Sequence, residues 1–299
     1  MDPLMQHHGQ MDQSQQRRFA VVLGVTLLFL LIETIGGWLT GSLALLADAG
    51  HLLGDAGALS VTLLAMRLTH RPATTTMTYG YQRAEILAAL FNGLALWLIA
   101  GLIWHEAYSR LHTPPAIQGL GLTAVAAAGL AANLFSYVYL SSVEPGNLNT
   151  RSAVLHIMGD IMGSVGALAA GLVIWLTGWT LADPIASFLI GGLILVTSWG
   201  VIKQSIDVLM EATPKDIDPN AIMKALGTIP GLEGVHDLHV WSLRSGVYAL
   251  TVHGVIDEER NDAEILAGMS RLLAEEFHIH HTTIQLDRQP ALVQIDPPR

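Results

Sequence analysis

The chain has 299 residues, of which 51% are hydrophobic and only 13% are charged. A soluble protein normally carries about a quarter charged residues, so this deficit excludes an ordinary soluble globule and indicates an integral membrane protein. Cysteine is absent, which excludes disulfides, thiolate metal sites and thiol nucleophiles. The formal net charge is -10, and most of the surplus acid follows residue 211. The few Lys and Arg residues form no cluster interleaved with aromatics, so we expect no nucleic-acid partner.

The N-terminal part predicts a short polar tail followed by closely spaced membrane helices. Residues 1–18 are rich in Gln and lack a small-residue cleavage site, which favours a cytoplasmic tail over a cleaved signal peptide. Residues 19–66 carry only three charges and are long enough for two spans of about 20 residues each. Glycines at 36, 37 and 41 predict the turn between them. Further apolar runs bring the predicted spans to six: 86–104, 117–143, 152–182 and 183–202.

The distribution of basic residues predicts the orientation of these spans. Cytoplasmic loops of membrane proteins carry an excess of Lys and Arg, so both termini are predicted to be cytoplasmic. On the other side Arg110 stands alone, against eight residues on the cytoplasmic side: Arg17, Arg18, Arg67, Arg71, Arg83, Arg151, Lys203 and Lys215.

Beyond the last span the sequence becomes polar and predicts a small soluble domain. The order is helix, strand, strand, helix, strand, with helices on one face of a sheet. Such an α+β unit buries little core, so support from a second copy is expected. We predict three parts: tail 1–18, six-helix membrane domain 19–211 and cytoplasmic domain 212–299. The predicted elements are helices 220–226 and 262–277 and strands 235–243, 247–256 and 282–286.

Two pentapeptides of one pattern, His-apolar-apolar-Gly-Asp, lie in apolar runs about a hundred residues apart. They are His51 to Asp55 and His156 to Asp160. Residues four apart project from one face of a helix, so each pentapeptide offers a nitrogen and an oxygen together. Two such faces make a four-ligand pocket suited to a tetrahedral divalent metal, zinc first. The glycine at the fourth place favours close helix approach.

The predicted topology places these pairs on the second and fifth spans, which we expect to cross the membrane in the same direction. The four side chains are then expected at one depth. Ionisable residues inside a bilayer cost upwards of about 2.5 kcal/mol and usually serve a function. Asp48 precedes His51 by three residues and shares its helix face. It is a candidate for an extra metal ligand, for an outer partner that orients an imidazole, or for a proton acceptor. Glu33 fits a structural pairing or a role in proton relay equally well.

The charges of this pocket suggest a mechanism. Two carboxylates balance a dication while two neutral imidazoles complete its shell. After the ion leaves, protonation relieves the repulsion between the carboxylates, so metal and protons compete for one site. If the site opens alternately to each side of the membrane, this competition becomes export of metal in exchange for protons.

Four motifs in this order resemble the cation diffusion facilitator family, most closely its zinc-exporting bacterial branch. They are Gly41 to Asp55, Tyr79 to Glu85, Asn149 to Asp160 and His236 to Trp241. The resemblance implies a six-helix transporter with a cytoplasmic ferredoxin-like domain, working as a homodimer in the bacterial inner membrane. His51, Asp55, His156 and Asp160 fall on the family's transport-site positions, and His at the first position favours Zn²⁺ over cadmium or manganese. The long His-rich loop that the family's eukaryotic members carry between the fourth and fifth helices is missing, which suggests a prokaryotic source.

The resemblance also implies a cytoplasmic metal site, at His236, His253 and Asp287. Gln285 stands where some members have histidine, and His280 or His281 is a candidate for a further ligand. From strand geometry alone, His236 and His239 are an odd number apart and are expected on opposite sheet faces. A polar sheet face with solvated histidines explains these residues equally well.

Two other functions compete with zinc/proton exchange. An intramembrane zinc hydrolase needs a general base beside its ligands and an open position for water, and neither pentapeptide provides them, so we expect no enzyme. A membrane metal sensor needs an output element, and no kinase, cyclase or DNA-reading sequence follows the spans. Export of another divalent cation, Cd, Co, Mn or Fe, is the remaining alternative.

Overall fold

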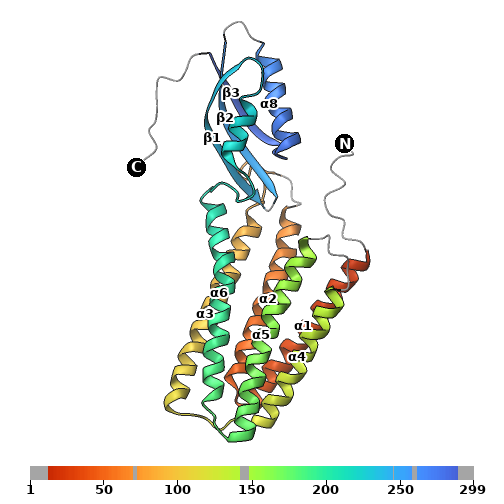
Figure 1. The fold of residues 1–299 in the computed structure, drawn as a ribbon, viewed down its shortest axis with the longest axis vertical. Coiled ribbons are helices and arrows are strands. Elements are labelled where there is room, and N and C mark those ends of the chain that lie inside the picture. The colour runs from red at the N-terminus through yellow and green to blue at the C-terminus, as the bar shows by residue number, and fades with distance from the viewer. Residues whose placement is uncertain (1–12, 70–72, 142–147, 245, 258–260, 289–299) are drawn as a thin grey trace. The chain divides into compact units, whose positions relative to one another are not determined.

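Figure 1 shows the computed structural model, which describes residues 13–69, 73–141, 148–244, 246–257 and 261–288. Inside the helices, side chains are not described at 13–20, 58–69, 140 and 148–156. The chain separates into two compact units. The first comprises Met1–Val61 with Phe91–Ile202, and the second Thr62–Leu90 with Lys203–Arg299. This division cuts through long helices, and the domain limits expected from the sequence stay predictions.

Six long helices account for the apolar part of the chain. Within the described residues, α1, α3, α4, α5 and α6 are long and apolar enough to cross a membrane. The predicted sixth span is α2, which carries the first pentapeptide. The bounds are α1 Gln13–Thr40, α2 Leu43–Thr69, α3 Ala84–His112, α4 Gly119–Ser141, α5 Leu148–Thr177 and α6 Ala182–Leu209.

The first helix differs from the prediction at both ends. It begins at Gln13, six residues earlier than expected. Gly36 and Gly37 lie inside it rather than in the turn, which falls at Gly41 with a φ of 76°. A methyl group at Gly36 would meet Val125 at 2.9 Å, so this glycine serves close packing of α1 on α4.

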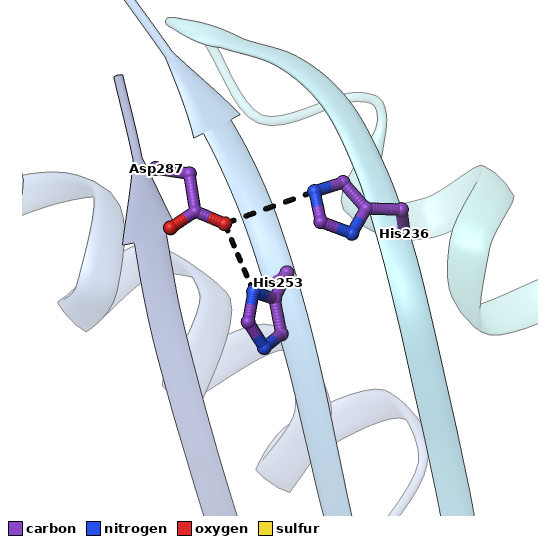
Figure 2. A group of neighbouring side chains, drawn as sticks. All are labelled: His236, His253 and Asp287. Carbon is purple, nitrogen blue, oxygen red and sulfur yellow. Dashed lines mark hydrogen bonds and ion pairs between the residues drawn. The ribbon is translucent and has the colours of Figure 1, made fainter. Parts of the chain in front are cut away.

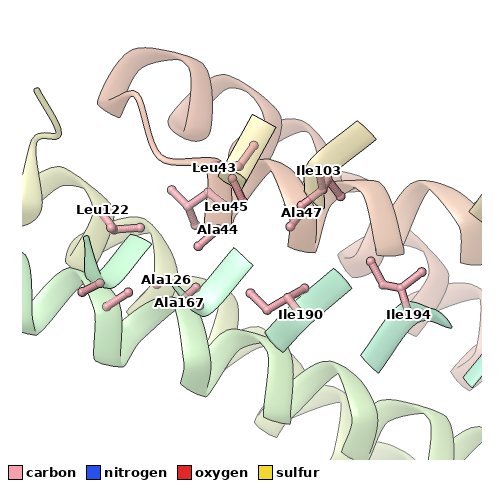
Figure 3. Packing of buried hydrophobic residues seen from close by; sticks show 14 of the residues in the cluster. Leu43, Ala44, Leu45, Ala47, Ile103, Leu122, Ala126, Ala167, Ile190 and Ile194 are labelled. Carbon is pink, nitrogen blue, oxygen red and sulfur yellow. The ribbon is translucent and has the colours of Figure 1, made fainter. Parts of the chain in front are cut away.

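Small residues let the helices of the first unit approach closely. Figure 3 shows alanines of α2, α4 and α5 in one buried cluster with larger side chains such as Ile103 of α3 and Ile190 of α6. At the crossing of α4 and α5, a methyl group at Gly119 would lie 2.6 Å from the Trp175 backbone nitrogen. Membrane helices gain little from hydrophobic exclusion, so this close van der Waals packing holds them together.

The start of α2 is held by a carboxylate from α6. Asp183 is fully buried and accepts hydrogen bonds from Ser42 Oγ at 2.5 Å, Leu43 N at 2.9 Å and Ala44 N at 3.1 Å. These amides are unpaired donors at a helix N-terminus, where negative charge is also favourable. Arg110 donates to the Gly41 carbonyl at 2.6 Å and lies 3.6 Å from Asp183. The helix carrying His51 and Asp55 is thereby fixed at its first turn.

The second unit contains the predicted α-β-β-α-β arrangement, which is confirmed. Its sheet has the order β1-β2-β3, with β1 antiparallel and β3 parallel to β2. Both helices have N-caps, Asp218 accepting from Asn220 N and Asn261 from Ala263 N. Their apolar faces pack on one sheet face around Leu250. The bounds are α7 Pro219–Leu226, β1 Leu232–Arg244, β2 Val247–Ile256, α8 Asp262–Glu276 and β3 His281–Asp287.

Candidate metal-transport site

The first pentapeptide and the end of the second meet inside the helical unit. His51 Nε2 lies 3.2 Å from Asp160 Oδ1 and 3.9 Å from Asp55 Oδ2. One ligand atom from each of the three residues lies within 4.8 Å of the others. His51 and Asp160 are only 6% and 5% exposed. Two carboxylates and an imidazole therefore converge in a buried position, a donor set that fits zinc.

The fourth predicted ligand, His156, lies on α5 one turn before Asp160. Its side chain is outside the described part of the structure. Residues four apart share a helix face, so the backbone keeps His156 on the face that carries Asp160. Its participation as a ligand stays a prediction.

The two helices that carry the pentapeptides run in opposite directions, contrary to the expectation from the sequence. His51 faces Asp160, while Asp48, one turn earlier on α2, faces Ser164, one turn later on α5. In parallel helices the partner of Asp48 would come earlier than Asp160, not later. Successive spans alternate in direction, so the second and the fifth run in opposite directions. His51 lies at the same depth in the helix bundle as Asp160. The antiparallel arrangement predicts that Asp55 lies at the same depth as His156.

The two pentapeptide glycines have different surroundings. A methyl group at Gly54 would overlap Leu96 of α3, so this glycine permits close contact between α2 and α3. At Gly159 a methyl group would meet no described atom within 4 Å. The expected packing role of the glycine is therefore seen for the first pentapeptide, whereas no described residue packs closely on the glycine of the second.

Asp48 and Glu33 are both buried, at 2% and 1% exposure, but neither belongs to the group of three ligands. Asp48 accepts a hydrogen bond from Ser164 Oγ at 3.2 Å. Ser164 in turn accepts one from Asn133 Nδ2 at 3.0 Å. The sequence interpretation missed both neutral residues, although the four-residue spacing of Ser164 from Asp160 would have placed it on the ligand face.

In the second unit, three predicted residues gather on the sheet face opposite the helices (Figure 2). His253 Nδ1 lies 2.9 Å from Asp287 Oδ2, and His236 Nε2 lies 3.7 Å from the same oxygen. His236 Nε2 is shielded from solvent and has no hydrogen-bond partner among the described residues. The donor set of two imidazoles and a carboxylate fits a divalent metal. His280 and His281 do not belong to this group.

A β-bulge corrects the expectation for His239. His236 pairs with His253 and His239 with Thr251, so three residues of β1 span two of β2. The extra residue is accommodated at Asp237, whose φ is 51°. Paired residues share a face, and His253 and Thr251 are two apart, so His239 lies on the same face as His236. His239 Nε2 contacts Asp237 Oδ1 at 3.0 Å.

Asp287 already has hydrogen-bond donors within the protein. Gln285 Nε2 donates to Asp287 Oδ1 at 2.9 Å, and the His253 ring contacts Oδ2. The hydrogen bond from Gln285, followed by that from His253, holds the pKa of the Asp287 carboxyl below its usual range. A metal at this position would compete with these contacts.

Two family descriptions match the chain in succession. The cation efflux transmembrane domain matches residues 19–210, and the cytoplasmic domain of the cation efflux protein matches residues 214–289. The chain belongs to this family, the cation diffusion facilitators. It is therefore a metal cation efflux transporter and an integral membrane protein, not an enzyme. The resemblance seen in the motifs is confirmed, as is the expected helical membrane domain joined to a small α+β domain.

Several curated relatives align over most of the chain. The metal cation efflux system protein CzcD of Cupriavidus metallidurans is 42% identical over 276 residues, 92% of this chain and 87% of that protein. The zinc transporter ZitB of Escherichia coli is 41% identical over 281 residues, 93% and 90% of the two chains. The cadmium, cobalt and zinc/H⁺-K⁺ antiporter of Bacillus subtilis is 41% identical over 265 residues, 87% and 85%.

Proposed function

We propose that this protein exports zinc from the cytoplasm in exchange for protons, by alternating access around His51, Asp55, Asp160 and His156. One observation carries the proposal: three of these residues, from two antiparallel helices, converge within 4.8 Å in a buried position. A dication there is balanced by two carboxylates and held by neutral imidazoles. When it leaves, protons compensate the remaining negative charge.

Zinc is the favoured substrate on the ligand chemistry. Imidazole nitrogens suit zinc better than they suit magnesium, calcium or manganese, which prefer oxygen. ZitB is a zinc transporter, whereas the Bacillus relative takes cadmium and cobalt as well. Another divalent cation, Cd, Co, Mn or Fe, is therefore the second candidate. A metal sensor finds no support in the described fold.

We further propose a homodimer in a bacterial inner membrane, with both termini cytoplasmic. The match to the family's cytoplasmic domain and the small core of the α+β unit support association through a second copy. His236, His253 and Asp287 are proposed to bind a second zinc, which acts on transport without being transported.

Proteoliposomes test the proposed function directly. Zinc flux into vesicles containing the wild-type protein should rise when an imposed pH gradient drives protons the opposite way, and Asp55→Ala should abolish it. Cadmium and cobalt added in parallel should compete more weakly than zinc. Zinc flux that ignores the pH gradient would contradict the coupling, and normal transport by Asp55→Ala would contradict the site.

A further inference from the structure

A second polar layer lies one helical turn from the ligand layer, inside the same bundle. Asp48 precedes His51 by three residues on α2, and Ser164 follows Asp160 by four on α5. Ser164 Oγ donates to Asp48 Oδ2 at 3.2 Å and is itself fixed by the amide of Asn133 on α4. Asp48 and Ser164 are 2% and 1% exposed. This layer is as deeply buried as the ligand layer, but it offers oxygen atoms and no histidine nitrogen.

The side chain of Glu33 on α1 also lies close to this polar layer. Its carboxylate lies directly against the backbone of Gly129, which is one turn before Asn133 on α4. A methyl group at Gly129 would collide with Glu33 Oε1 and would lie 3.8 Å from Ser164 Oγ. A methyl group at Gly163 would lie 2.8 Å from Asp48 Oδ1. Two glycines on α4 and α5 therefore leave the space that the two carboxylates occupy.

These carboxylates are short of positive charge and of hydrogen-bond donors. Glu33 Oε2 and Asp48 Oδ1 accept no hydrogen bond from any described residue. The ionisable groups that act on them from neighbouring helices are His51 and Asp55 on α2 and Asp160 on α5. On α4, the neutral amide of Asn133 donates to Ser164, which in turn donates to Asp48. No described Lys or Arg pairs with either carboxylate, and a buried charge without a partner is costly.

A transported dication would not neutralise Glu33 and Asp48, because its two positive charges are already balanced by Asp55 and Asp160. We propose that Glu33 and Asp48, which lie in the same polar layer as Ser164, form a proton-carrying site separate from the metal ligands. This inference rests on the proposed zinc/proton exchange. A proton bound to a carboxylate oxygen removes one of the two negative charges. Zinc arriving one turn away repels it electrostatically, and the proton leaves to water on the side to which the site is open.

The separation of the two layers explains how exchange can be obligatory. With a neighbouring pair of carboxylates, occupancy by zinc and by the proton are linked through charge across one helical turn. The inference therefore predicts that the proton count of zinc binding depends on Glu33, which is on a helix that contributes no ligand to the metal.

Proton release on zinc binding tests this inference. Zinc is added to the purified full-length protein in weakly buffered detergent solution, and released protons are counted with an indicator dye while affinity is measured across pH. Glu33→Gln should still bind zinc, release about one proton fewer per zinc, and show a shallower dependence of log Kd on pH by about one unit. Ser164→Ala should move both quantities in the same direction. Equal proton counts and slopes in wild type and both variants would overturn the inference.

Glycine substitutions give a second readout that does not alter any polar group. Gly129→Ala presses a methyl group on the Glu33 carboxylate and should reduce the proton count, whereas Gly166→Ala, whose nearest contact would be Ile190 at 3.9 Å, should not. A wild-type protein that transports zinc independently of pH would contradict the proposed exchange and this inference together. Coupled wild-type transport with unchanged proton counts in Glu33→Gln and Gly129→Ala would overturn this inference alone.

Discussion

The buried cluster in the helices and the half-exposed cluster on the sheet use the same residue types in different ways. His51 and Asp160 are almost inaccessible, and the helical cluster brings two carboxylates to one imidazole. On the sheet, the single carboxylate of Asp287 already accepts hydrogen bonds from Gln285 and His253. The first arrangement is costly without a cation, whereas the second is stable without one. This difference supports the proposal that the helical cluster binds the transported metal, whereas the sheet cluster binds a metal that is not transported.

The largest expected effect concerns Asp160. Asp160→Ala should reduce zinc transport at low zinc concentration by more than about 100-fold, because even partners of metal ligands contribute about 10- to 100-fold. Zinc flux into proteoliposomes measures it, and Asp207→Ala on α6 is the matched control. Transport within a few fold of wild type would show that the two clusters do not differ as described.

A smaller effect is expected from the packing of the first pentapeptide. Gly54→Ala forces a methyl group into Leu96 and should destabilise the protein by about 1–3 kcal/mol, as overpacking does. Thermal unfolding in detergent is the measurement. Gly159→Ala is the control in the second pentapeptide, since its methyl group meets no described atom within 4 Å. Equal destabilisation by both would contradict the asymmetry of the two helices.

His253→Ala tests the other side of the comparison. The variant should lose bound zinc from the sheet while its maximal flux falls by less than about tenfold. His253 lies outside the helical cluster, so its effect on flux should stay below the roughly 10- to 100-fold expected for direct partners of metal ligands. Equilibrium dialysis gives the zinc stoichiometry, with His278→Ala as a control histidine beyond α8. Loss of flux as complete as in Asp160→Ala would make the sheet cluster part of the transport path.

The smallest effect is a pH dependence at Asp287. The pKa of the Asp287 carboxyl is lowered in the folded protein. Its contribution to stability is therefore fully present above the unfolded pKa of about 3.9, and it is lost as the pH falls through the lowered folded pKa. Hydrogen exchange of β3 in the presence of a chelator should therefore rise at acid pH in wild type more than in Asp287→Asn. Asp257→Asn serves as control. The same acid response in wild type and Asp287→Asn would mean that another group causes it.

The sequence contained most of the site but not its orientation. The four-residue spacing of His51 and Asp55 was enough to predict a shared helix face, and the repeated pattern pointed to a partner helix. The direction of that partner required a correct count of alternating spans. Ser164 was missed because serine in an apolar helix normally bonds its own backbone, as Ser198 does with the Ile194 carbonyl.

Two other features depend on tertiary contacts that no local pattern encodes. The positive φ of the bulge at Asp237 is adopted by a residue other than glycine, so no local sequence signal marks the bulge. The face of His239 could therefore not be predicted from strand alternation. Asp183 was expected only to begin the last span, whereas it also caps α2, far away in the sequence. Strand and helix positions in the α+β unit were predicted within a few residues, because alternation and capping residues are local signals.

We propose above all that the pentapeptides of α2 and α5 bind the transported metal together. Zinc-edge X-ray absorption of full-length protein carrying His236→Ala and His253→Ala tests it most directly. We expect about four nitrogen and oxygen neighbours near 2.0–2.2 Å, with imidazole scattering, and loss of this signal when Asp160→Ala is added. A spectrum that Asp160→Ala leaves unchanged, or six oxygen neighbours without imidazole, would contradict it.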